Sequence, residues 1–249
     1  MSGVEQSLFA GVLVFCRIGA CLMTLPGFSS QRIAMRLRLF LAIAASLLIA
    51  PLAREAVAPA LTPHVSGQAL AILRETATGA TIGLVARFYI LAFEMMASAM
   101  STAIGLSAAF APPVEGDHMA PAFAGVMTLV ATMIFFAAGL DALALRALVG
   151  SYVAFPPGAP FAAAVSLRLV LDTLQEASLV CLQLAAPILA LSLAGNVVFG
   201  LLSRFMPQAP IYFVSTPLLI GVGLLLVFLA ERPMYELFVA AMARRIGAL

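Results

Sequence analysis

Long apolar runs, each broken by proline, glycine or a single charge, limit the folds open to this chain more than any other feature. Of its 249 residues, 63% are hydrophobic and 10% are charged, whereas soluble domains are about 45–50% apolar and about 25% charged. Since a helix of about 20 apolar residues crosses a bilayer, the sequence predicts an all-α, membrane-associated bundle. A subunit enclosed in a very apolar assembly would have the same composition.

The apolar runs number about six, and several are irregular. They cover residues 8–25, 39–50, 76–104, 122–140, 177–202 and 211–230. The second run is short for an upright crossing, residues 55–75 are expected to form a mixed connection, and residues 141–153 an amphipathic helix. Pro187 inside the fifth run predicts a kink. Kinked helices and hairpins packed in an assembly therefore fit the sequence better than six straight spans.

Single charges inside the apolar runs indicate contacts with protein rather than with lipid. Arg17 lies within the first run, and Arg87 and Glu94 lie within the third. A charge at the bilayer centre costs about 3 kcal/mol on insertion scales, so we expect each of these side chains to face a protein partner or an aqueous lumen. A proton relay through them is the less favoured interpretation. Gly79 and Gly83, four residues apart, predict a close approach between two helices.

The stretch between the third and fourth runs is irregular and has two possible structures. Pro112 and Pro113 lack backbone N–H donors, and Gly116 favours a turn. Irregular backbone at membrane depth persists only where it is buried in protein or lines an aqueous cavity. The stretch is therefore either a surface loop between two membrane helices or a loop that folds back into a pore. The candidate pore loop consists of Gly105, Leu106, Ser107, Ala108, Ala109, Phe110, Ala111, Pro112, Pro113, Val114, Glu115 and Gly116.

Residues that carry chemistry in enzymes are sparse, and the sequence contains no recognised catalytic or nucleotide-binding motif. Cys16, Cys21 and Cys181 are embedded in apolar runs, which is typical of small core residues. His64 and His118 are too few and too widely separated to indicate a metal centre. A net charge of +2 argues against a nucleic-acid partner. No residue pattern in the sequence therefore indicates catalysis or a bound cofactor.

Three parts of the sequence resemble the FliR/SctT family of type III secretion export-gate proteins. The C-terminal part is the most specific, and the resemblance covers nearly the whole chain. The matching segments are Phe15-Cys-Arg17-Ile-Gly19 with Pro26, Arg36-Leu-Arg38 and Pro51; Gly105-Leu-Ser107 with Pro112; and Gly200-Leu-Leu-Ser-Arg204-Phe-Met-Pro207-Gln208 with Ile211-Tyr-Phe213. The chain departs from the family pattern at Ile33-Ala-Met35, Ala142-Leu143 and Ala209-Pro210.

The resemblance implies a protein that is not an enzyme and that needs no cofactor. It implies a core subunit of the flagellar protein export gate, located in the bacterial inner membrane at the flagellar basal body. Its expected partners are FliP-, FliQ- and FlhB-type subunits and the unfolded flagellar proteins that pass through the pore. Within a single export-gate domain, residues 1–160 are expected to be FliP-like and residues 161–249 to form a FliQ-like helical hairpin. Residues 105–116 are expected to plug the closed pore.

Two other functions stay open. An injectisome subunit of the SctT type would share the C-terminal motif. A small-solute secondary transporter would share the broken helices and internal charges, although the two halves show no matching interrupted helices.

The polar-site residues that we expect to be buried in the bundle or to contact partner subunits are Arg17, Arg87, Glu94, Asp172, Glu176, Asn196, Arg204, Pro207 and Gln208.

Overall fold

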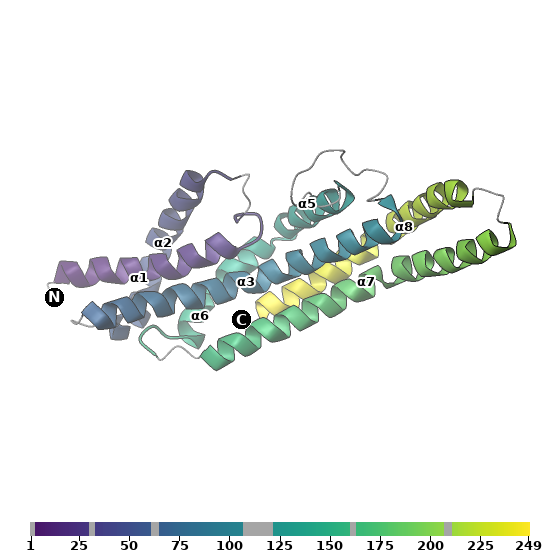
Figure 1. Ribbon diagram of the computed structural model, residues 1–249. Helices are drawn as coiled ribbons and strands as arrows, with labels where there is room; N and C mark the ends of the chain where they lie inside the picture. Colours follow the sequence, from purple (N-terminus) through teal and green to yellow (C-terminus); the bar gives the residue numbers. More distant parts are fainter. Residues whose placement is uncertain (1–2, 30–32, 61–64, 107–121, 160–162, 207–210) are drawn as a thin grey trace. The chain divides into compact units, whose positions relative to one another are not determined.

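The computed structural model describes residues 3–29, 33–60, 65–106, 122–159, 163–206 and 211–249, which are almost entirely helical (Figure 1). The predicted all-α class is confirmed. In chain order the elements are α1 (Gly3–Thr24), α2 (Met35–Val57), the 3₁₀ turn η1 (Ala58–Ala60), α3 (Val65–Ala103), α5 (Ala122–Ala137), α6 (Leu140–Ala154), α7 (Ala163–Phe205) and α8 (Ile211–Gly247).

The chain divides into two compact units, and α3, α7 and α8 contribute residues to both. Unit 1 consists of Met1–Tyr89, Phe136–Gln175 and Met242–Leu249, and unit 2 consists of Ile90–Phe135 and Glu176–Ala241. Unit 1 therefore contains α1, α2, α6 and the first part of α3. Unit 2 contains most of α5, α7 and α8, together with the end of α3.

Close contact between α1 and α3 shapes the core of unit 1. A Cβ atom on Gly79 would lie 2.0 Å from the carbonyl oxygen of Arg17, and one on Gly83 would lie 2.6 Å from that of Cys21. Neither position therefore has room for a side chain. The close approach predicted at these two glycines is confirmed, and Figure 1 shows α1 lying along the first part of α3.

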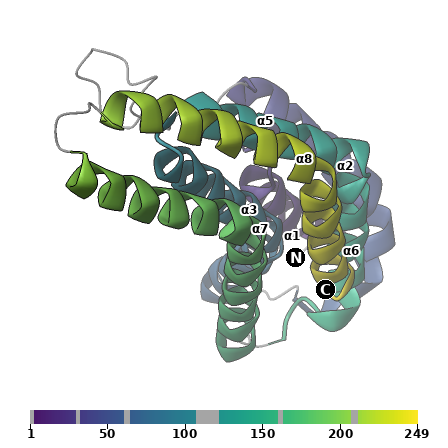
Figure 2. The same cartoon turned by 90° about the vertical axis from the view of Figure 1, so that its right-hand side faces the viewer.

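Aromatic and small residues hold unit 2 together. The centre of the Phe93 ring on α3 lies 5.6 Å from that of Tyr235 and 4.8 Å from that of Phe238, both on α8. Gly195 on α7 leaves room for Leu219 of α8, whose Cδ2 would lie 2.6 Å from a Cβ atom at that glycine. In this unit α7 and α8 run side by side, as Figure 2 shows.

Five of the described helices are long and apolar enough to cross a membrane, or six spans are present if α5 and α6 form one interrupted span. This number agrees with the predicted bundle of about six hydrophobic segments. Gly139 lies in the break between α5 and α6 with a φ of 68°, a left-handed conformation that favours glycine. The five candidate spans are Glu5–Thr24, Met35–Ala53, Ser66–Ala103, Ala163–Phe205 and Phe213–Gly247.

Two of the predicted segment boundaries are wrong, because the helices extend beyond the apolar runs. The run at 39–50 lies inside α2, and Met35–Ala53 is long enough to cross a membrane. The connection expected over 55–75 is largely helical, since α2 ends at Val57 and α3 begins at Val65. Backbone groups left outside a helix are costly in an apolar environment, which favours helix even across polar residues.

The Gly79→Ala substitution should destabilise the chain, because the added methyl group collides with the backbone of Arg17, which cannot rotate away as a side chain can. Overpacking of this kind costs about 1–3 kcal/mol. We expect a lower midpoint of thermal unfolding for the full chain in detergent, followed by circular dichroism.

Gly150→Ala in α6 is the matched control, since nothing lies within 4 Å of the added Cβ atom. It should be neutral, or stabilising by about 0.5–1 kcal/mol from the better helix propensity. Equal melting temperatures for the Gly79→Ala and Gly150→Ala variants would contradict the close approach of α1 and α3.

Candidate functional site

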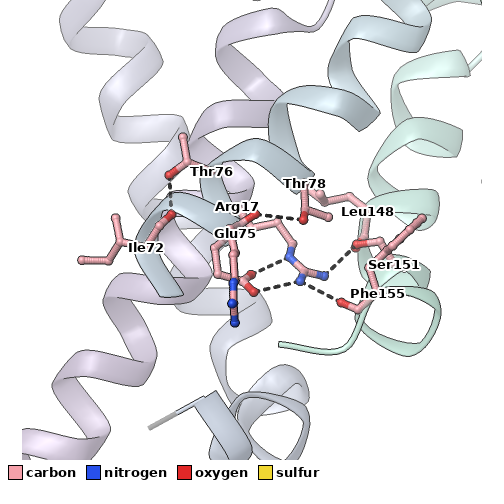
Figure 3. A network of polar contacts seen from close by, with 9 residues as sticks. Arg17, Ile72, Glu75, Thr76, Thr78, Leu148, Ser151 and Phe155 are labelled. Atoms are coloured by element: carbon pink, nitrogen blue, oxygen red, sulfur yellow. Dashed lines mark hydrogen bonds and ion pairs between the residues drawn. The ribbon is translucent and has the colours of Figure 1, made fainter. Parts of the chain in front are cut away.

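A buried ion pair between Arg17 and Glu75 lies at the centre of the candidate site (Figure 3). Arg17 is on α1 and Glu75 is on α3, 58 residues away in sequence. The Arg17 Nε donates to Glu75 Oε2 at 2.6 Å, and Nη2 donates to Oε1 at 3.0 Å. Only 1% of the Arg17 side chain and 4% of the Glu75 side chain are exposed. The guanidinium thus holds the carboxylate with two bonds, a strong and direction-specific geometry.

Residues at the end of α6 complete the surroundings of the guanidinium. Arg17 Nη1 donates to Ser151 Oγ at 3.1 Å, and Nη2 also donates to the backbone oxygen of Phe155 at 2.9 Å. The guanidinium carbon lies 4.2 Å from the centre of the Tyr152 ring, where the π-electrons of the ring attract a cation. One side chain on α1 therefore joins α3 and α6, as Figure 3 shows.

The arrangement suits a structural role more than a catalytic one. Both carboxylate oxygens of Glu75 accept bonds from Arg17, so the two charges cancel inside unit 1. The attraction between buried charges offsets their loss of hydration only when the geometry is good and the remaining donors are satisfied. Both conditions hold here, and the pair is therefore suited to holding three helices together rather than to moving protons.

Other charged residues of unit 1 have different surroundings. Arg87 on α3 donates to the hydroxyl of Ser29, which follows α1. Arg245, near the end of α8, donates to Thr173 Oγ1 at 2.9 Å and to a backbone oxygen one turn earlier on α7 at 3.0 Å. Arg245 thereby fastens the C-terminal part of α8 to α7 within unit 1. Neither of these partners could be identified from the sequence.

Several polar residues expected to be buried are on the surface of the single chain. Asp172, Asn196 and Arg204 on α7 are exposed, and Glu176 and Glu94 are half-buried. The buried face of α7 consists of small or apolar residues at a helical spacing, namely Thr173, Ala177, Cys181, Ala185, Ile188 and Ser192. Contact between the exposed polar residues and partner subunits stays a prediction. Pro207 and Gln208 lie outside the described residues.

Sequence reasoning missed Glu75, Ser151 and Tyr152, although a signal for Glu75 exists. Glu75 precedes Gly79 by four residues, so it shares the helix face on which the close approach to α1 was predicted. A buried arginine on the facing helix needs an acid at that face. Ser151 and Tyr152 carry no comparable signal, because nothing in their local sequence indicates a charged neighbour.

The first residues of the candidate pore loop are anchored within unit 2. Gly105 has a φ of 80°, which ends α3 and which L side chains rarely adopt. Ile104 fits against Gly223 of α8, where a Cβ atom would lie 2.6 Å from the Ile104 side chain. Leu106 is buried. The rest of the predicted loop, residues 107–116, lies outside the part of the chain that the structure describes.

A hydrogen bond and a cavity adjoin the start of this loop. The Ser192 hydroxyl on α7 donates to the backbone oxygen of Ala103, one of the last carbonyls of α3. The cavity has a volume of about 370 Å³. Its polar lining consists of hydroxyl and amide side chains from Thr102, Asn196, Ser203, Ser215 and Thr216.

In the described ranges, no group of three or more His, Cys, Asp or Glu side chains is placed to hold a metal ion. Cys21 and Cys181 are buried and Cys16 is half-buried, in keeping with their prediction as small core residues.

Known export proteins are similar to this chain along nearly its whole length. Residues 8–244 match the family model described as bacterial export proteins, family 1. The flagellar biosynthetic protein FliR of Caulobacter vibrioides is 32% identical over 229 residues, which cover 90% of this chain and 88% of the relative. FliR of Aquifex aeolicus is 27% identical over 230 residues (91% and 86%), and FliR of Escherichia coli K12 is 27% identical over 212 residues (84% and 78%).

Removing one member of the buried pair should destabilise the chain far more than removing both. Arg17→Met leaves the Glu75 carboxylate buried without its partner, which costs about 3–5 kcal/mol. The double variant Arg17→Met/Glu75→Leu should recover most of that loss, because apolar side chains of similar size replace both charges. The free energy of unfolding in detergent, measured by denaturant titration, gives the coupling between the two sites.

Arg146→Gln on α6 is the control, since Arg146 is exposed, and it should change the free energy of unfolding by about 0.5 kcal/mol or less. Additive losses in the double variant would show that Arg17 and Glu75 act independently, against the bidentate geometry.

Proposed function

Because the chain belongs to the family of bacterial export proteins, family 1, we propose that it is a core subunit of the flagellar protein export gate. The observation that carries the proposal is the match over residues 8–244, together with relatives that bear the name flagellar biosynthetic protein FliR. The resemblance seen in the three sequence segments is confirmed by these comparisons. The chain is a membrane component of the flagellar export apparatus.

The proposed gate also contains FliP-, FliQ- and FlhB-type subunits and lies in the inner membrane at the flagellar basal body. In this proposal residues 1–160 are FliP-like, and residues 161–249 form a FliQ-like hairpin. Large apolar side chains exposed on α7 and α8 in unit 2 support such an assembly, because they need a covering of lipid or protein. They include Leu193, Val197, Leu201, Phe205, Phe213, Leu225 and Phe228.

The proposed role of residues 105–116 is to close the pore when no substrate is present. In this proposal the small residues of the loop let the backbone cross a narrow opening, and Phe110 supplies apolar bulk to fill it. Ile104 packed against Gly223 and Ser192 bonded to Ala103 support this role, since a plug needs a fixed base. A lid that opens should otherwise be held weakly, and the few charges of the loop suit that requirement.

Two alternative functions differ from this proposal, one in the secretion system and the other in the kind of molecule transported. An injectisome subunit would have the same fold, but the relatives reported above are all named as flagellar proteins, which favours the flagellar assignment. A small-solute transporter has no such support, because the match to the export family covers nearly the whole chain.

Deletion of the gene should abolish flagellar filaments and swimming, because export of the filament proteins requires the complete gate. The measurement is motility in soft agar together with the amount of flagellin outside the cells. Expression of the wild-type chain from a plasmid should restore both. A deletion strain that swims normally would exclude the flagellar function, and loss of uptake of a small solute would favour the transporter.

Deletion of residues 106–113 should leave the gate assembled but make the membrane leak ions, because the pore loses its closure while the helices keep their packing. The measurement is ion conductance of membranes that contain the assembled gate. A second variant that lacks residues 107–113 retains the buried Leu106 and separates loss of the loop from damage at its base. Wild-type conductance in both variants, with secretion continuing, would show that the stretch is an ordinary connection.

A further inference from the structure

A cavity of about 310 Å³ lies beside the buried ion pair, entirely within unit 1. Its charged and polar walls come from Arg17 on α1 and from Arg74, Glu75 and Thr78 on α3. The segment after α6, which includes Ala159, and the first turn of α7 close the other sides. Since a water molecule in the liquid occupies about 30 Å³, this space exceeds the needs of a single bridging water.

The charges that line the cavity do not balance. Arg17 and Glu75 neutralise each other through two short bonds, which leaves the charge of Arg74. The Arg74 Nη1 donates to the backbone oxygen of Ala159 at 3.5 Å, at the outer limit of a hydrogen bond. Among the described residues, no carboxylate forms an ion pair with Arg74. The cavity therefore carries an excess positive charge in a half-buried position.

The neighbouring backbone reinforces this positive potential. Val165, in the first turn of α7, lines the cavity, and the first N–H groups of a helix have no partner within the helix. The helix dipole places its positive end at the same point. The start of α7 is therefore a second source of attraction for an anion, independent of Arg74.

We propose that this cavity binds a phosphate group and that Arg74 is its principal cationic ligand. A guanidinium offers several N–H donors in a planar fork that matches phosphate oxygens. The volume accommodates a phosphate with an attached glycerol-sized group, and Ala154 and Phe155 provide apolar contacts for the rest of a ligand. The phosphate comes either from a lipid headgroup or from free inorganic phosphate. The site does not depend on the proposed role in protein export.

The test uses the full chain purified from membranes in mild detergent, together with any subunits that co-purify. Dioleoyl phosphatidylglycerol, dioleoyl phosphatidylcholine and inorganic phosphate are the three probes, and native mass spectrometry counts the molecules bound at fixed ionic strength. Arg74→Gln removes the cation, and binding should weaken by about tenfold or more, as expected for loss of a charged hydrogen bond. Arg146→Gln, an exposed arginine on α6 of the same unit, should bind as the wild type does.

Two substitutions at one exposed position test the charge without disturbing the ion pair. Ala159 lies at the cavity and is exposed, so a long side chain there does not need to enter the core. Ala159→Glu should weaken binding by about fivefold, and Ala159→Lys should strengthen it by a similar factor, because the added charge acts at short range. These two variants decide the question even if Arg74→Gln fails to fold.

The probes distinguish the sources of the phosphate. Preference for phosphatidylglycerol over phosphatidylcholine, with dependence on Arg74, identifies a lipid headgroup. Binding of inorganic phosphate that depends on Arg74, without a preference between the two lipids, identifies the free anion. Equal binding of all probes by wild type, Arg74→Gln and both Ala159 variants overturns the proposal. Loss of a co-purifying subunit from Arg74→Gln with unchanged probe binding also overturns it, because a carboxylate of a protein partner would then be the ligand.

Discussion

Neutralising Arg17 is the requirement on which the packing of unit 1 depends. Glu75, Gly79 and Gly83 are spaced by four residues and share one face of α3, and α1 packs against that face. Because the two glycines lack Cβ atoms, the backbones come close enough for two bonds between Arg17 and Glu75 one turn away. The glycines and the ion pair thus act together: the glycines set the distance between the helices, and the pair fixes their register.

The same guanidinium determines how α6 meets α1. Ser151 uses its hydroxyl twice, since it donates to the backbone oxygen of Leu148 at 2.6 Å and accepts from Arg17 at 3.1 Å. The backbone oxygen of Phe155 follows the end of α6, where carbonyl groups lack partners within the helix, and Arg17 donates to it. A buried network stabilises a fold only when its members are satisfied. Arg17 meets this condition, because N–H groups that do not bind Glu75 donate to Ser151 and to the backbone oxygen of Phe155.

Local sequence patterns predict the helices, the close approach at Gly79 and Gly83 and the need to neutralise Arg17, because each depends on residues near one another in the chain. They do not predict that Glu75 is the partner. Arg17 and Glu75 are 58 residues apart in the sequence. Glu75 also lies at the end of the polar stretch 55–75, which the sequence predicts to be a connection. The helix continues through Glu75 because a charge ends an apolar run but not a helix, and glutamate is a good helix former. For the candidate pore loop, the structure adds only its base, so the proposed role of the remainder still depends on its sequence.

The surface of α7 in unit 2 combines polar and large apolar residues, so neither lipid nor water is a favourable environment for all of them. Asn196 and Arg204 are exposed beside the large apolar side chains of Val197 and Leu201. Arg204 lies in the last turn of α7, where its long side chain can reach water at the membrane surface, but Asn196 lies well inside the helix, and a polar amide loses hydration in lipid. Water, in turn, would leave the apolar side chains unburied. Another protein surface can bury the apolar groups and also offer hydrogen-bond partners to the polar ones. This mixed face therefore supports a subunit of an assembly more directly than the apolar content of the chain does, because any free-standing membrane protein would share that content.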